Sequence, residues 1–464
     1  MSAAEEIAKL QARNAELQAE NAELVAKVQT LEQKVLELLK MIEQQGVKKN
    51  SRNSSTPPSQ DKTKPRRKRS LRAKSKRKTG GQKGHDGHTL QMSDTPDKTE
   101  TLYSLYCSEC GEELSEEDQN LVSKRQVVIL PPIEPQVVEY QQFGCTCKRC
   151  GHHQKASYPD GVNAPIQYGS EVMALVGYFS VFQYVPYQRL KLLFKDVFNL
   201  SISEGSINNL LKRGAQKAMP VYDTILEQIK TSEYVGSDET GAKVNGKKWW
   251  IWVWQNIQNT FLKAAKSRGF ASVEEVLPEG LPNATVGSDR WAAQLKITSK
   301  AKQLCLPHLL RDLNYLIEVD QSEWAQQFKE LLKKALALKP ISIQRNQAFS
   351  PQEVLVQQVE KQLNELLAFT LTKKQTPLTL TFQTQMLKNR NHLFTFLYQL
   401  NVPPDNNASE RAVRNVKVKQ KISGQFKSGQ QTFCVWRSVI DTLRKRHLNV
   451  LEHLKLIMKC PVPE

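Results

Sequence analysis

Leucine recurs every seven residues near the N-terminus, and a second seam of residues recurs with the same period. The two seams are Leu10, Leu17, Leu24, Leu31 and Leu38, and Ile7, Asn14, Asn21, Val28 and Val35. Leucine at one seam position, with β-branched residues and asparagine at the other, favours a parallel two-stranded coiled coil. A seam asparagine pairs best with the same residue of a second chain, so residues 1–46 predict a homodimer. The alternative is a lone amphipathic helix folded back on the rest of the chain.

The apolar pattern stops at Gly46, and residues 47–98 contain almost no large apolar side chains. Fifteen Lys and Arg residues stand against one acid between Val47 and Gly84, which accounts for most of the net charge of +19. Such a segment buries too little surface to offset its chain entropy, so we expect it to be disordered when free. A concentrated basic arm indicates DNA phosphates as the partner, and a solvated tail is the alternative. The residues expected to contact DNA are Arg66, Arg67, Lys68 and Arg69.

Residues 99–165 contain two Cys-x-x-Cys pairs separated by two short apolar runs, 126–130 and 136–140. The pairs are Cys107 with Cys110 and Cys147 with Cys150. Two such pairs joined by a β-hairpin are typical of a structural Zn²⁺ site with four thiolate ligands. Two disulfides are the alternative, and the neighbouring Cys145, His152 and His153 are further candidate zinc ligands.

Residues 166–230 have a helical pattern, with a short turn before a helix that Ser203 or Ser206 is placed to cap. This arrangement resembles a helix-turn-helix DNA-binding domain. Its candidate DNA contacts are Asn208, Asn209, Lys212 and Arg213. Three packed helices without a role in DNA binding are the alternative.

The pattern changes to strands over residues 231–311. Residues 234–240 form a short strand that ends in acids, Asp238 among them. An Asn-Gly turn leads into residues 249–254, residues 261–265 form a third strand, and a helix follows around 271–277. A fourth strand then ends at Asp289. Three meandering strands, a helix and a strand that returns beside the first is the ribonuclease-H-like order, which predicts that the two acids meet at adjacent strand ends.

A third carboxylate stands at the start of a predicted helix in the last segment, residues 403–464. Glu410 shares one helix face with Arg414, Lys417 and Lys421, which we expect to hold DNA phosphates. Three carboxylates suit two Mg²⁺ or Mn²⁺ ions that promote phosphoryl transfer. The alternative role for Glu410 is a capping box with Asn407. Residues 312–402 are a predicted helical insertion with breaks at Pro340, Pro351 and Pro377.

The composition also indicates the cellular compartment of the protein. No apolar run approaches the ~20 residues of a membrane helix, and the Glu-rich N-terminus is unlike a secretory signal. Scattered cysteines suit a reducing compartment. We therefore expect a cytoplasmic α/β multidomain protein that is not bound to a membrane.

With these residues assembled, the chain resembles the large catalytic transposase of the insertion sequence 66 family over nearly its whole length. The matching motifs are the zipper, Asn-Ser-Ser-x-Pro-Pro-Ser at 53–59, Gly-Gly-Gln-x-Gly-His at 80–85, the paired Cys-x-x-Cys, Val-Pro-Tyr-Gln-Arg-Leu at 185–190, Asp-Glu-Thr at 238–240, the segment 303–311, and Asp-Asn-Asn-x-x-Glu-Arg at 405–411. The resemblance implies a DDE-type transposase that acts on terminal inverted repeats and target DNA, with Asp238, Asp289 and Glu410 as metal ligands. It also implies small accessory proteins encoded by the same element, and a location at the nucleoid of a bacterial cell. The sequence departs from the family pattern after Asp289, where Arg290-Trp291 stands.

Supporting residues are expected around these acids: His308, Arg311, Asn407, Arg411 and Arg414. One interpretation places His308 beside the acids, where it contacts the scissile phosphate or orients a metal ligand. The alternative is a half-buried histidine beside a core Cys305. Three other functions share most of these features: a non-catalytic DNA-binding regulator, an inactive transposase derivative, and a nuclease without strand transfer.

Overall fold

The computed structural model describes residues 3–46, 50, 53, 84, 87, 90–371 and 377–461. The chain divides into two compact units, one of Met1–Lys64, Val138–Leu193 and Ser201–Glu464, and one of Pro65–Val137 with Phe194–Leu200. Arg66, Arg67, Lys68 and Arg69 lie outside the described residues. In the described part of the chain, no helix is long and apolar enough to cross a membrane.

The N-terminal heptads form one continuous helix, α1 (Ala3–Gly46). The seam side chains that the structure describes are exposed: Leu24 is 56% and Leu31 is 59% accessible. The helix therefore carries an apolar stripe that this single chain leaves open to solvent. Beyond the helix, Asn53 is buried, and its side-chain amide donates to Glu318 at 2.7 Å.

The predicted helical segment before the sheet is confirmed. Its elements are α2 (Ser170–Gly177), the π-helical turn η3 (Tyr178–Phe182), α3 (Tyr187–Phe198), α4 (Glu204–Lys217) and α5 (Met219–Lys230). Ser203 is the residue that caps α4, because its hydroxyl accepts the backbone N–H of Ser206 at 3.0 Å.

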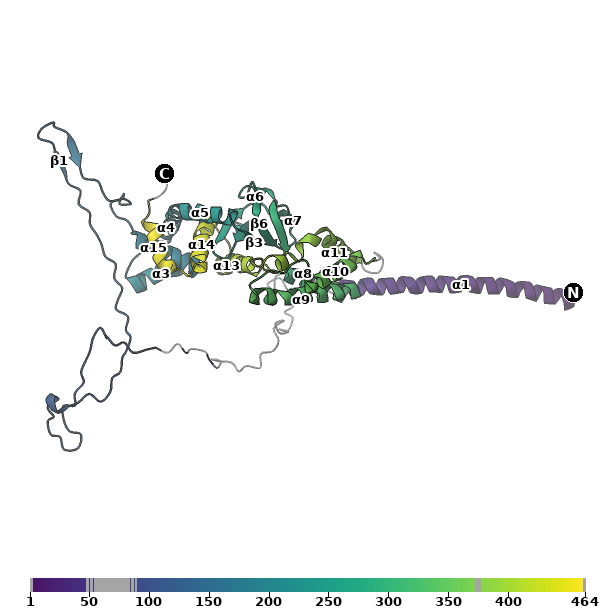
Figure 1. Cartoon of the computed structure of the whole chain (residues 1–464), viewed down its shortest axis with the longest axis horizontal. Coiled ribbons are helices and arrows are strands. Elements are labelled where there is room, and N and C mark those ends of the chain that lie inside the picture. The colour runs from purple at the N-terminus through teal and green to yellow at the C-terminus, as the bar shows by residue number, and fades with distance from the viewer. Residues whose placement is uncertain are drawn as a thin grey trace. The chain divides into compact units, whose positions relative to one another are not determined.

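A five-stranded mixed sheet follows, in the order β5-β4-β3-β6-β7. Two of its strands, β3 and β6, are labelled in Figure 1. The elements of this region are β3 (Tyr234–Val244), β4 (Lys247–Gln255), β5 (Thr260–Ala265), α6 (Ala271–Glu274), β6 (Leu281–Ser288), α7 (Ala292–Leu295) and β7 (Ser299–Leu304). The first three strands pair antiparallel, and β6 pairs parallel with both β3 and β7. Four strands and the helix between them lie close to where the pattern predicted, but β3 does not end in the acids: it continues past Thr240 to Val244, so Asp238 lies inside the strand. The strand β7 was not predicted. Its polar sequence, Ser-Lys-Ala-Lys-Gln-Leu, lacks the continuous apolar run of a buried parallel strand.

The edge strand β5 is protected by side chains of α14 (Gln430–Lys445). The outward backbone N–H groups of Thr260 and Leu262 donate to the hydroxyls of Thr442 and Ser438, at 3.1 and 2.8 Å. The N–H of Ala264 donates to Gln431 at 3.1 Å. An edge strand with free N–H groups invites pairing with other chains, and α14 removes that hazard.

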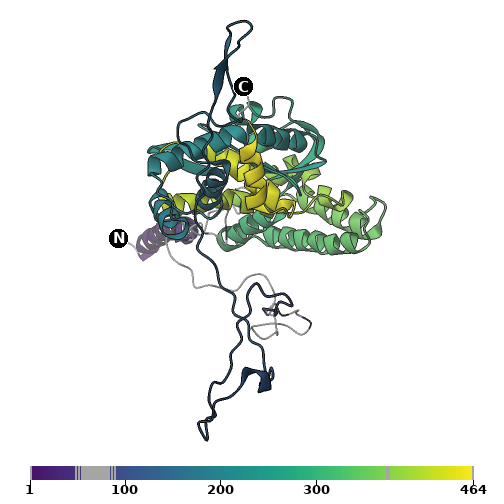
Figure 2. The same ribbon diagram turned by 90° about the vertical axis from the view of Figure 1, so that its left-hand side faces the viewer.

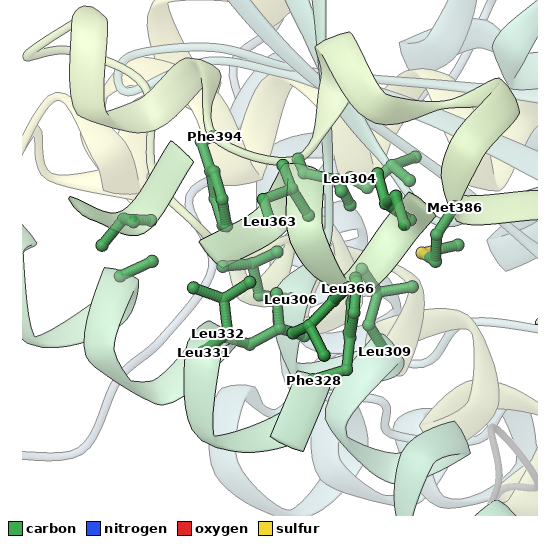
Figure 3. Close-up of a cluster of buried hydrophobic side chains, with 14 of the residues drawn as sticks. Leu304, Leu306, Leu309, Phe328, Leu331, Leu332, Leu363, Leu366, Met386 and Phe394 are labelled. Carbon is green, nitrogen blue, oxygen red and sulfur yellow. The ribbon is translucent and has the colours of Figure 1, made fainter. Parts of the chain in front are cut away.

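The helical insertion has its own apolar core, to one side of the sheet in Figures 1 and 2. Its helices are α8 (Leu306–Asp320), α9 (Glu323–Gln344), α10 (Val354–Ala368), α11 (Pro377–Lys388), η4 (Arg390–His392) and α12 (Thr395–Tyr398). Leu304, Leu306 and Leu309 join Phe328 and Leu363 in this core (Figure 3). The core therefore fixes the junction between β7 and α8.

One expected break in the insertion is wrong, because Pro340 lies inside α9. A proline removes one backbone hydrogen bond of a helix, and packing must offset that loss. The preceding side chain, Lys339, is buried and donates to the carbonyls of Phe396, Gln399 and Leu400 at 2.9–3.3 Å. These tertiary bonds hold the last turns of α9 in place.

The C-terminal segment consists of α13 (Asn407–Ser423), α14 and α15 (Val450–Lys459). Trp436 of α14 is fully buried, and its indole donates to the carbonyl of Leu211 at 2.9 Å. A Cβ added at Gly177 or at Gly214 would lie 2.3 Å from the Trp436 ring, so these two glycines make room for it. The last helices therefore complete the core of the helical segment that precedes the sheet.

Candidate active site

Asp238 lies in the central strand β3, with β4 on one side and β6 on the other. Burial raises the pKa of the Asp238 carboxyl well above its usual range, and the negative charges of Asp289 and Glu410 add to the rise. The negative charge of Glu239, the next residue, also raises the pKa of Asp238. Carboxylates from three separate parts of the sequence therefore influence one another at this position.

Strand register explains why the first two acids meet. Gly236 of β3 is paired with Gly287 of the parallel strand β6. Asp238 and Asp289 each follow by two residues, so they occupy equivalent positions at neighbouring strands. Position 287 requires a glycine, because an added Cβ there would lie 2.3 Å from the hydroxyl of Tyr234.

Glu410 lies on the first turns of α13, which packs on β3 and β4. The capping-box alternative is wrong: Asn406, not Asn407, is the N-cap, and no side-chain cap is formed among the described residues. The loop is held instead by Asn406, which is buried and donates its side-chain N–H to the carbonyl of Ser237 at 2.8 Å. This bond joins the start of α13 to the residue before Asp238.

A glycine allows α13 to approach β3 closely. A Cβ added at Gly236 would lie 2.4 Å from Gln255 Nε2, 2.6 Å from Ser409 Oγ and 3.1 Å from Asn406 Oδ1. Two of these atoms belong to the start of α13, next to Glu410. The absence of a side chain at position 236 therefore sets the depth at which Glu410 reaches the sheet.

His308 lies between the second and third acids. Its Nδ1 atom is 2.9 Å from Asp289 Oδ1, and its Nε2 atom is 3.6 Å from Glu410 Oε1. Arg311, one turn further along α8, places a guanidinium nitrogen 3.5 Å from the same Glu410 oxygen. The histidine side chain is 11% exposed. This placement favours the interpretation of His308 as a neighbour of the acids over that of a core histidine.

Two carboxylate oxygens of this cluster are suited to hold a cation. Asp289 Oδ1 and Glu410 Oε1 are buried and accept no well-directed hydrogen bond in the described part of the chain, although the two ring nitrogens of His308 lie 2.9 and 3.6 Å from them. A buried carboxylate oxygen without a partner is costly unless a cation or a proton satisfies it. Oxygen donors of this kind match the preference of Mg²⁺ and Mn²⁺, so the three acids fit the expected metal.

Sequence reasoning missed a second group that borders these acids. Glu239 has a side chain that is 4% exposed, and it pairs with Arg268 at 2.5 Å and with Gln294 at 2.6 Å. The Arg268 guanidinium stacks on Trp291, 3.6 Å from the ring centre. The acidic motif at 238–240 was a signal for Glu239, but nothing local marks Arg268.

The unusual pair after Asp289 has tertiary partners on both sides. Trp291 donates its indole N–H to the carbonyl of Arg268 at 3.1 Å. Arg290 pairs with Asp312 of α8 and donates to Gln385 of α11 at 2.7 Å. The loop that carries Asp289 is therefore tied both to the loop after β5 and to the helical insertion.

The predicted DNA contacts of α13 and α4 differ in accessibility. Arg411, Arg414, Lys421, Asn209 and Lys212 are exposed, as is Asn407, whereas Asn208 and Arg213 are half-buried. Lys417 donates to the carbonyl of Gly241 at 2.6 Å, so this ammonium group is already engaged by the protein. The exposed residues are the ones free to meet phosphates.

Each Cys-x-x-Cys pair forms a tight turn that closes on a glycine with positive φ, Gly111 or Gly151. In each turn a backbone N–H returns to the first cysteine carbonyl, at 3.0 Å for Cys107 and 2.9 Å for Cys147. Backbone N–H groups directed at the sulfur, chiefly that of the second cysteine, lower the pKa of Cys107 and of Cys147. Such turns suit thiolate ligands. The two pairs belong to different compact units.

The hairpin expected between the two pairs is wrong. Residues 126–130 and 136–140 form no strand, and Pro131, Pro132 and Pro135 interrupt the ladder that two strands would need. The short strands lie elsewhere: β1 (Gly144–Thr146) pairs with β2 (His153–Lys155) around the second pair of cysteines. Within it, the His153 ring is 2.7 Å from the Thr146 hydroxyl.

Comparison with known families agrees with this arrangement. Residues 165–432, which include β3, β6, α8 and α13, match the transposase IS66 family. Residues 5–91 match a family of unknown function. No curated protein matches the chain. Since the matched region spans more than half of the sequence and contains all three converging acids, the chain belongs to the IS66 family of transposases.

Proposed function

We propose that this transposase cleaves DNA at the terminal inverted repeats of an insertion sequence and joins the released ends to target DNA. Asp238, Asp289 and Glu410 are the proposed ligands of two Mg²⁺ or Mn²⁺ ions. The observation that carries the proposal is their convergence: the charges of Asp289 and Glu410 both act on Asp238, although the three lie far apart in sequence. The strand order β5-β4-β3-β6-β7 supports a ribonuclease-H-like core, in which this chemistry is expected.

The protein's own groups would position the reactants. A bound metal pair supplies activation of a water or a DNA 3′-hydroxyl and stabilisation of the leaving oxygen. His308 and Arg311 hold the Asp289 and Glu410 carboxylates in place, and the Asn406 bond to Ser237 holds the helix that carries Glu410. The exposed Arg411 and Arg414 of α13 would bind the flanking phosphates.

The segments before the core would supply DNA affinity. The basic arm, the helix α4 and the two Cys-x-x-Cys turns as zinc ligands are the proposed elements; the turns are those of Cys107 with Cys110 and of Cys147 with Cys150. The exposed Asn209 and Lys212 of α4, with the half-buried Asn208 and Arg213, would contact the ends. Phosphate contacts predict binding that weakens steeply with salt.

A cleavage assay tests the function directly. The full chain, incubated with a labelled inverted-repeat end, a target plasmid and Mg²⁺, is expected to give nicked ends and joined products. Nicking without joining would assign the chain to the nucleases. Binding without nicking would leave only a DNA-binding regulator or an inactive derivative.

We also infer that α1 is a dimerisation helix whose partner is the α1 of a second copy. Leu24 and Leu31 are more than half exposed, and asparagines at positions 14 and 21 of the same stripe can pair only with their equivalents. Changing both Leu24 and Leu31 to glutamate should convert a dimer into a monomer, because four charges would then face each other in the seam. Sedimentation equilibrium measures the change.

A matched control lies on the opposite side of the same helix. Ala19 and Ala26 are seven residues apart and outside the seam, so the same double change to glutamate there should leave the dimer intact. A wild-type chain that sediments as a monomer at micromolar concentration would refute the zipper.

A further inference from the structure

We propose that Asp289, Cys305 and His308 form a binding site for one soft divalent cation of the Zn²⁺ type. The donor atoms of these three residues lie within 4.8 Å of one another. The proposal deepens the proposed function, because it shares Asp289 with the magnesium ligands and assigns Cys305, which the phosphoryl-transfer chemistry does not use.

The three donors come from a short and rigid part of the structure. Cys305 is the residue before α8 and His308 is on its first turn, while Asp289 follows the neighbouring strand β6. His308 Nδ1 lies 3.1 Å from Cys305 Sγ and 2.9 Å from Asp289 Oδ1. Leu306 and Leu309, on the other side of the same turn, are fully buried in the core of the helical insertion. The donors are therefore held together by packing and not by one another alone.

The chemical types of the donors select the cation. Zinc accepts thiolate, imidazole and carboxylate ligands together, at about 2.0–2.3 Å, and commonly uses three protein ligands with an open fourth position. A thiolate is a poor ligand for Mg²⁺, which takes oxygen donors. On binding, the Cys305 thiol releases its proton to solvent, so one thiolate and one carboxylate balance the two charges of the ion.

The surroundings of the donors resemble those of a built metal site. The backbone N–H of Asn406 donates to Cys305 Sγ at 3.3 Å, which stabilises the negative sulfur. The second ring nitrogen of His308 faces Glu410 at 3.6 Å, and Glu410 is itself approached by Arg311. A metal-bound histidine usually directs its other N–H at such a carboxylate, which fixes the ring and strengthens the ligand. Asp289 Oδ1 is buried and accepts no well-directed hydrogen bond in the described residues, although His308 Nδ1 lies 2.9 Å away, so it is the oxygen left for the ion.

The consequence is competition for Asp289. An ion bound by the thiolate and the imidazole withdraws this carboxylate from the magnesium pair. Zinc would thereby hold the transposase in an inactive form, and removal of zinc would release it.

Metal content tests the site without DNA. The full chain, dialysed against Zn²⁺ and then against buffer, is measured by mass spectrometry of the metal, beside Cys305→Ser and His308→Gln. Both variants should contain one zinc fewer per chain than the wild type, whatever the Cys-x-x-Cys pairs hold. Cys434→Ser is the matched control: this thiol is equally buried in α14 but outside the cluster, so its zinc content should equal that of the wild type.

Cobalt gives a second readout. In the Co²⁺-loaded chain, the thiolate-to-cobalt absorption should decrease in Cys305→Ser and remain in Cys434→Ser. Equal zinc contents in the wild type and both site variants would overturn the proposal, as would loss in Cys305→Ser alone with full content in His308→Gln. Asp238→Asn should keep the full zinc content, because Asp238 is not a ligand here. A protein that binds this zinc but never cleaves DNA would count against the proposed function and not against this site.

Discussion

Asp238→Asn is expected to reduce DNA cleavage by on the order of 10³-fold or more, which corresponds to about 4 kcal/mol of lost transition-state stabilisation. The amide retains the shape of the side chain but removes the negative charge that a metal ligand needs. Affinity for the inverted repeat should change by less than about twofold, because phosphate contacts elsewhere supply most of it. Cleavage with Mg²⁺ and binding without it are measured on the same labelled end.

The same substitution should stabilise the metal-free fold. Because burial and neighbouring carboxylates raise the pKa of Asp238 in the folded state, its ionisation opposes folding. The protonated Asp238 carboxyl contributes stability to the fold. This contribution is fully present below the pKa of the unfolded chain, near 4, and is lost as the pH rises through the raised pKa of the folded state. At pH 7 in EDTA, Asp238→Asn should therefore melt at a higher temperature than the wild type and should gain less from added Mg²⁺.

The exposed Asp223 of α5 provides the control. Asp223→Asn removes the same charge from the chain and should alter neither cleavage nor the response to Mg²⁺. Equal losses of binding and cleavage in Asp238→Asn would show that Asp238 maintains the fold and does not hold a metal.

Gly236→Ala should lower cleavage by about 100-fold, although the residue carries no chemistry. The new Cβ would meet Gln255 Nε2 at 2.4 Å and Ser409 Oγ at 2.6 Å, so the start of α13 must move away from β3. A displacement of about 1 Å in a ligand-bearing element is enough to cost this much. Overpacking of this kind should also lower the free energy of unfolding by about 1–3 kcal/mol.

Gly241→Ala is the matched control on the same strand, because its added Cβ would lie 3.9 Å from the nearest atom, in Trp250. Its cleavage rate and stability should stay close to those of the wild type. Removing the Ser409 hydroxyl should relieve part of the clash, so the double variant Gly236→Ala, Ser409→Ala should cleave faster than Gly236→Ala alone. If the two glycine variants behaved alike, the close approach of α13 would not be what positions Glu410.

Local patterns predicted most elements of the core. The Asn245-Gly246 turn, the Trp-rich strand after it and the strand that ends before Asp289 were all read from alternation and turn residues. These features depend on neighbours in sequence, so a local pattern contains them. Local patterns did not predict the polar strand β7 or the proline inside α9, because strand pairing and side-chain packing override local conformational preference at these positions.

The sequence by itself determined the family, the long N-terminal helix and four of the five strands, and it predicted the three acids as metal ligands. Only the tertiary structure decided how those acids meet. The register of Gly236 with Gly287 aligns Asp238 with Asp289. The absence of a side chain at position 236 lets the start of α13, which carries Glu410, approach β3 closely. The structure also brought Arg268 to Glu239, and it placed Cys305 and His308 beside Asp289. These contacts join residues that lie far apart in the chain, and close packing, not local conformational preference, fixes their distances.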